Sequence, residues 1–120
     1  MNKESSEAID FIFVMSLAVY RNELSRSLAI ENTFNKYGTS KGSCDMYIGI
    51  IRNMLDGKPY KRQMSSTATD SLLRNISSEL GENYLRNALT ALDGHIHHYE
   101  KQNKTKMNKL RAVYDKWSSS

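Results

Sequence analysis

Residues 82–93, ENYLRNALTALD, place apolar and polar side chains on two opposite edges with the period of an α-helix. The apolar edge, extended beyond this stretch, contains Leu85, Ala88, Leu89, Leu92 and Ile96. The polar edge contains Asn83, Arg86, Asn87 and Thr90. This spacing predicts an amphipathic helix that buries its apolar edge against the rest of the chain.

The polar edge has side chains that can read DNA. Arginine pairs with guanine, asparagine with adenine, and threonine with either, all in the major groove. A second helix that precedes such a helix after a tight turn would complete a helix-turn-helix. We therefore expect Asn83, Arg86, Asn87 and Thr90 to contact bases.

The preceding residues supply helices and turns in the order that this motif needs. Thr67 and Asp70 form a loose capping box ahead of a segment with leucines at helical spacing, and Gly81 supplies the turn. Further upstream, Ser43 can cap a helix over 44–56, which Gly57 ends. We assign 43–101 to a helix-turn-helix core.

Two alternatives remain open after Gly94. The helix can continue to Lys101, because Ile96 and Tyr99 extend its apolar edge. The helix can instead break at Gly94, so that residues 95–106 form a small β-wing.

The segment 5–37 contains no Gly or Pro, which predicts one long helix or two in tandem. Its first half is apolar on nearly every face, so that every face must be buried. We expect one face to meet the domain core and another to meet a second subunit; the alternative is a central helix wrapped by its own chain. The expected dimer interface consists of Phe11, Phe13, Val14, Leu17 and, from a C-terminal helix over 104–117, Trp117.

Composition indicates a soluble globular protein. The 120 residues fit one domain, 1–120, with 39% hydrophobic and 25% charged residues. The lone Cys44 cannot form an internal disulfide, which fits a reducing compartment. The apolar stretch 9–20 is shorter than the ~20 residues that span a bilayer, and acidic residues precede it. We therefore expect a cytoplasmic protein that does not enter membranes.

The net charge of +4 is concentrated in two short segments. Residues 101–111 hold Lys101, Lys104 and Lys106 without an acidic residue, and Lys61 and Arg62 follow Pro59. Such clusters either form a solvated face or neutralise phosphates, which makes binding salt-dependent. Their position after the predicted reading helix favours phosphate contacts.

Catalytic and metal-binding patterns are weak. His95, His97 and His98 lie within four positions, whereas metal ligands and catalytic groups usually converge from separate segments. The sequence has no nucleophile elbow and no Gly-rich phosphate loop. We expect no enzyme activity, no cofactor and no metal, with the histidines solvated near phosphates or at a subunit boundary.

The stretch from Gly57 to Ile96 resembles the core of a winged helix-turn-helix domain. The Gly57-Lys58-Pro59 connector, the Leu72-Leu73 pair and the helix 82–93 that closes near Gly94 carry this resemblance. Together with the flanking helices, they resemble MarR-like regulators, which dimerise through their termini. The resemblance implies a mostly α fold and a homodimeric transcriptional regulator that binds double-stranded DNA.

A second function remains open from the sequence. A small helical interaction module, such as an inhibitor, an adaptor or an antitoxin-like partner, would use tyrosines and Trp117 as anchors and would not bind DNA.

Overall fold

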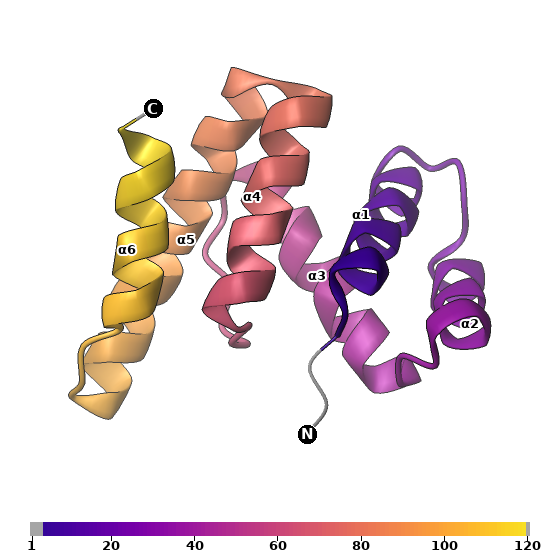
Figure 1. Cartoon of the computed structure of the whole chain (residues 1–120), viewed down its shortest axis with the longest axis horizontal. Coiled ribbons are helices and arrows are strands. Elements are labelled where there is room, and N and C mark those ends of the chain that lie inside the picture. The colour runs from indigo at the N-terminus through magenta and orange to yellow at the C-terminus, as the bar shows by residue number, and fades with distance from the viewer. Residues whose placement is uncertain (1–3, 120) are drawn as a thin grey trace. The chain divides into compact units, whose positions relative to one another are not determined.

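A computed structural model describes residues 4–119, and helices account for all of the regular secondary structure in that range (Figure 1). The helices, in chain order, are α1 (Ser6–Tyr20), α2 (Arg26–Tyr37), α3 (Lys41–Asp56), α4 (Ser66–Leu80), α5 (Glu82–Asn103) and α6 (Asn108–Ser118). The expected mostly α fold is confirmed. None of these helices is both long enough and apolar enough to cross a membrane.

The contacts within the chain define two compact units, with the boundary after Arg52 inside α3. We call residues up to Arg52 the N-terminal unit and residues from Asn53 the C-terminal unit. Each is described by itself.

Residues 5–37 form two helices, α1 and α2, where the sequence left open one long helix or two in tandem. α1 ends at Tyr20, and Asn22 adopts a left-handed conformation with a φ of 60°. Asparagine tolerates this conformation better than most residues. Ser25 then starts α2 by accepting a hydrogen bond from the Leu28 amide, which satisfies a helix-end donor. The tandem arrangement is therefore the one that the chain adopts.

A small apolar cluster holds the N-terminal unit together. Ala29, Cys44 and Ile48 are buried, with Met15, Val19, Leu24 and Ile30 packed against them. Arg26 fixes α2 to α3: its Nε lies 2.6 Å from Asp45 Oδ1, and its Nη2 donates to the Asp45 carbonyl at 2.9 Å. Cys44 is a core side chain here and carries a free thiol.

The C-terminal unit contains three helices that pack side by side. Gly81, with a φ of 89°, is the single residue between α4 and α5, and α6 packs against both helices (Figure 1). A helix-turn-helix joins its helices through a three- or four-residue turn and crosses them at about 90–120°. The α4–α5 pair is instead a tight antiparallel hairpin.

Gly94 does not break α5, which continues to Asn103. The helix extension is therefore correct, and the β-wing is wrong for residues 95–103. Residues 104–107 connect α5 to α6 without forming a strand. The glycine has a packing role: an ideal Cβ at this position would lie 2.6 Å from Pro59 Cγ. Pro59 in the connection between α3 and α4 can approach α5 only because position 94 lacks a side chain.

Candidate nucleic-acid interface

The outer edge of α5 presents all four residues expected to read bases. Asn83, Arg86, Asn87 and Thr90 are exposed. Thr90 Oγ1 donates to the Arg86 carbonyl at 3.0 Å. Asn87 differs in that its side-chain amide is also bound within the unit, where Nδ2 donates to the Leu55 carbonyl at 3.0 Å.

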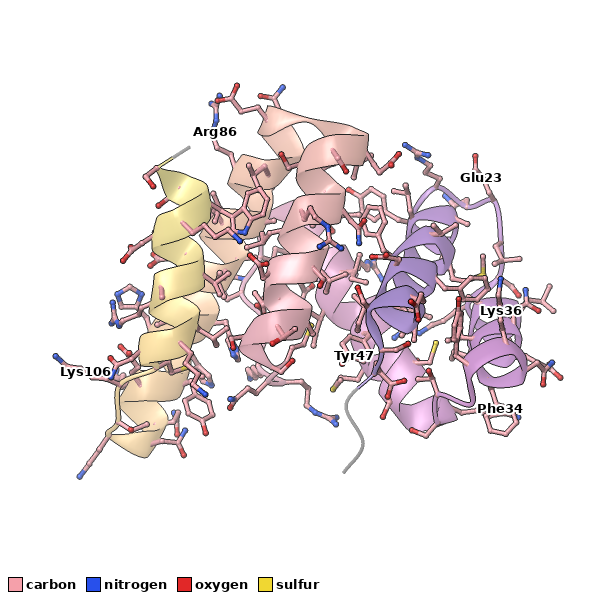
Figure 2. All side chains as sticks on the ribbon, in the orientation of Figure 1. Glu23, Phe34, Lys36, Tyr47, Arg86 and Lys106 are labelled. Atoms are coloured by element: carbon pink, nitrogen blue, oxygen red, sulfur yellow. The ribbon has the colours of Figure 1, made fainter. Side chains whose placement is uncertain are left out.

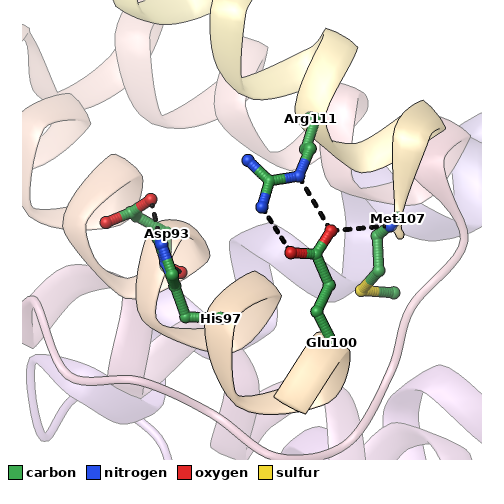
Figure 3. Close-up of polar contacts among 5 residues, drawn as sticks. All are labelled: Asp93, His97, Glu100, Met107 and Arg111. Carbon is green, nitrogen blue, oxygen red and sulfur yellow. Dashed lines mark hydrogen bonds and ion pairs between the residues drawn. The ribbon is translucent and has the colours of Figure 1, made fainter. Parts of the chain in front are cut away.

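Acidic side chains share this outer edge. Arg86 Nη2 lies 3.5 Å from Glu82 Oε1, one helical turn away. Further along α5, Asp93 Oδ1 lies 3.3 Å from His97 Nδ1 (Figure 3). Carboxylates at both positions oppose the approach of phosphates, so the outer edge is close to charge-balanced and less suited to DNA than its sequence suggested.

Basic side chains gather at the other end of α5. Because α4 and α5 are antiparallel and α5 has 22 residues against 15 in α4, the last turns of α5 extend past the start of α4. The connection that carries Lys61 and Arg62 enters α4 at this same end. We call this group the basic end; its exposed members are Lys61, Arg62, Lys101, Lys104, Lys106 and Lys109.

The basic end and the outer edge of α5 are well separated. Arg86 and Lys106 lie toward opposite ends of the C-terminal unit (Figure 2). At 1.5 Å per residue, Arg86 and Lys101 are about 22 Å apart along α5. The two sets of predicted DNA-binding residues therefore do not form one compact site.

Glu100 organises the turn that presents the lysines. Its carboxylate accepts hydrogen bonds from the Met107 amide at 2.8 Å and from Arg111 Nε at 2.8 Å, and a second Arg111 nitrogen contacts its other oxygen (Figure 3). The Arg111 guanidinium, followed by the Met107 amide, lowers the pKa of Glu100 to about 2. The one carboxylate at this turn is thus engaged by Arg111, and the neighbouring lysines keep their positive field.

His95 is a core residue, which corrects the expectation that all three histidines are solvated. Its side chain is 0% exposed, its ring stacks on Tyr60 at a centroid distance of 4.5 Å, and its Nδ1 lies 2.7 Å from the Tyr60 carbonyl. A carbonyl oxygen only accepts hydrogen bonds, so Nδ1 carries the hydrogen. His97 and His98 are exposed. Within residues 4–119, no three histidine, cysteine or acidic side chains gather as metal ligands would.

Acidification is expected to destabilise the protein through His95. Burial is the main cause that lowers the pKa of His95, so the unfolded chain binds more protons below the ordinary histidine pKa of about 6.5. The free energy of unfolding should therefore fall as the pH decreases from about 7 to about 5. Urea denaturation across this range measures the effect, and the contribution of Glu100 is lost only at lower pH.

Two variants test whether His95 causes this pH dependence of stability. In His95→Asn the side chain no longer titrates but keeps an N–H donor for the Tyr60 carbonyl, so its stability should vary less with pH. His97→Asn, at an exposed position, should follow the wild-type curve. Equal slopes for wild type and His95→Asn would contradict the assignment.

The residues expected at a dimer interface do not form one exposed surface. Phe13 is buried, whereas Val14 is 56% exposed. The Phe11 ring lies 5.5 Å from the Tyr37 ring within the N-terminal unit, and Leu17 is partly buried. Trp117, in the C-terminal unit, donates from Nε1 to Asp70 Oδ1 at 2.7 Å. The homodimer stays a prediction.

An open hollow between α4 and α6 contains charged groups that satisfy one another. Its lining residues are Ser66, Thr67, Asp70, Ala112, Val113 and Lys116. Asp70 Oδ1 lies 2.9 Å from Lys116 Nζ and also accepts the Trp117 hydrogen bond. This arrangement is typical of a structural ion pair and gives no reason to expect a ligand.

Sequence reasoning missed a group of aromatic and lysine side chains in the N-terminal unit. Phe34 and Tyr37 are large and exposed on α2, with lysine ammonium groups over nearby rings. The i, i+3 spacing of two aromatic residues on a polar helix was the only available signal.

No family model, no curated protein and no solved structure matches this chain. The resemblance to MarR-like regulators therefore rests on the sequence pattern alone and stays a prediction.

Proposed function

We propose that this protein binds double-stranded DNA through phosphate contacts made by the basic end of the C-terminal unit. The main support for this proposal is the distribution of charge along the chain. The residues after Arg52 include eleven lysines and arginines and seven aspartates and glutamates, so the whole net charge of +4 belongs to this part of the chain. At the basic end, the lysines are exposed, and Glu100 at the turn between α5 and α6 is bound to Arg111.

Such contacts position a protein on DNA without specifying a sequence. Each lysine that neutralises a phosphate releases a counterion, which gives affinity that depends on salt but little on bases. We therefore propose phosphate-led and largely sequence-tolerant binding. Base reading by Asn83, Arg86, Asn87 and Thr90, and action as a homodimeric transcriptional regulator, stay predictions from the sequence.

Replacing Lys101, Lys104 and Lys106 together by Gln tests the proposal. We expect the affinity for two unrelated duplexes to fall equally, by on the order of tenfold or more at low salt. The slope of log affinity against log salt should decrease in magnitude by about 0.9 for each lost phosphate contact. Fluorescence anisotropy with labelled duplexes over a salt series measures both quantities.

Arg86→Gln is the matched control, since it removes one exposed positive charge from the same helix far from the basic end. Its affinity should stay within about twofold of wild type for both duplexes. A larger loss on one duplex than on the other would show that the outer edge of α5 reads bases. Wild-type protein that binds neither duplex, or a triple variant with an unchanged slope, would overturn the proposal in favour of the interaction module.

A further inference from the structure

Exposed large apolar side chains of the described residues all lie in the N-terminal unit. They are Val14, Leu28, Phe34 and Tyr37. Phe34 and Tyr37 are 44% and 36% exposed, and their i, i+3 spacing makes them neighbours on the surface of α2. The Phe11 ring of α1 extends this aromatic surface, because it lies 5.5 Å from the Tyr37 ring.

Two lysines lie over these rings. Lys36 Nζ is 4.8 Å from the Phe11 ring centroid and 5.7 Å from that of Tyr37. Lys41 Nζ is 5.4 Å from the Phe34 ring centroid. Figure 2 shows Phe34 and Lys36 projecting from α2. We call this group the aromatic–lysine patch; its members are Phe11, Phe34, Lys36, Tyr37 and Lys41.

The lysines of the patch are accessible to an incoming partner. Both are exposed, and neither pairs with a carboxylate in the part of the chain that the structure describes. A cation over an exposed aromatic ring is held only weakly. An anion can therefore engage each ammonium group at little cost, directly beside an aromatic surface.

We propose that the aromatic–lysine patch binds single-stranded nucleic acid. Bases stack on Phe34 and Tyr37, while Lys36 and Lys41 hold the adjoining phosphates, which is the combination that sequence-tolerant single-strand binding requires. Duplex DNA keeps its base faces inside the stack and cannot use the rings. An acidic peptide would satisfy the lysines but would leave the rings in water.

The aromatic–lysine patch shares no residue with the basic end. The experiment uses protein in which Lys101, Lys104 and Lys106 are already replaced by Gln, because this removes the phosphate contacts proposed for the basic end. We expect this protein to bind oligothymidine of about 16 nucleotides, within the range of single-strand site sizes. Adding Phe34→Ala and Tyr37→Ala should weaken binding by about tenfold or more, because the bases lose the rings on which they stack. Fluorescence anisotropy at low salt measures the affinity.

Leu28→Ala is the matched control, since Leu28 is 51% exposed on the same helix but outside the patch. It should bind as its parent does, and circular dichroism should show equal helix content for all variants. Lys36→Gln with Lys41→Gln should reduce the salt slope without removing stacking.

Two further probes separate stacking from charge attraction. An abasic oligonucleotide of the same length carries the phosphates without bases, and oligoglutamate carries negative charge without either. Oligothymidine should bind at least tenfold more tightly than both, and the loss of the two rings should remove this preference. Equal affinity for oligothymidine and the abasic chain, tighter binding of oligoglutamate, or no effect of the aromatic substitutions would overturn the proposal.

Discussion

His95→Ala should lower the free energy of unfolding by about 3–5 kcal/mol, as expected when a large ring is removed from a packed core. The ring is fully buried and stacks on Tyr60. Its loss also leaves the Tyr60 carbonyl without the donor that lies 2.7 Å away, and an unsatisfied buried acceptor is itself costly. Urea denaturation near neutral pH, followed by circular dichroism, measures the change.

The matched control is His97→Ala, because His97 lies on the same helix with its side chain 65% exposed. Its stability should remain within about 0.5 kcal/mol of wild type. His95→Asn, which keeps an N–H donor for Tyr60, should lose less stability than His95→Ala. If His95→Ala unfolds at the wild-type urea concentration, His95 does not anchor the α3–α4 connection.

Local patterns predicted most of the helices, because apolar spacing and caps act over a few residues. The apolar spacing placed α5. The cap predicted at Thr67 was wrong by two residues, because Ser65 caps α4 by accepting a hydrogen bond from the Ala68 amide and Thr67 lies inside the helix. The break between α1 and α2 was not located because neither Gly nor Pro marks it. The turn is made instead by Asn22, in a left-handed conformation, and by Ser25, which caps α2. Asparagine and serine also occur inside helices, so neither residue marked the break.

Gly94 was ambiguous because glycine has two different uses in a helix. Local sequence cannot distinguish a helix breaker from a site of close approach, since the approaching residue is far away in the chain. Pro59 provides that contact here. The apolar positions of Ile96 and Tyr99 were the correct signal, since they continued the helical period across the glycine.

In the candidate sites too, the sequence predicted local properties but not contacts between residues far apart in the chain. Exposure of the lysines at 101–106 followed from their sequence, because charged runs rarely become buried. By contrast, the hydrogen bond from Asn87 to Leu55 depends on how α5 packs against the end of α3. The aromatic–lysine patch also needed tertiary structure, because Phe11 and Tyr37 meet only when α1 and α2 fold against each other.

Replacing Gly94 by Ala should lower the free energy of unfolding by about 1–3 kcal/mol, although alanine is the better helix former. An ideal Cβ at position 94 would lie 2.6 and 2.9 Å from two atoms of the Pro59 ring. A proline ring cannot rotate away as a flexible side chain does, so the connection after α3 must shift. The overpacking cost should exceed the gain of about 1 kcal/mol in helix propensity. Urea denaturation measures the net change.

Gly49 supplies a control of opposite sign. It also lies inside a helix, α3, but its ideal Cβ would meet only a terminal nitrogen of Arg26 at 3.6 Å, an ordinary contact. Gly49→Ala should therefore stabilise the protein by about 0.5–1 kcal/mol through helix propensity and a less flexible unfolded chain. Stabilisation by both substitutions would show that Pro59 does not pack closely on α5. Opposite signs would establish that Gly94 is required by the approach of Pro59, and not by any flexibility of the helix.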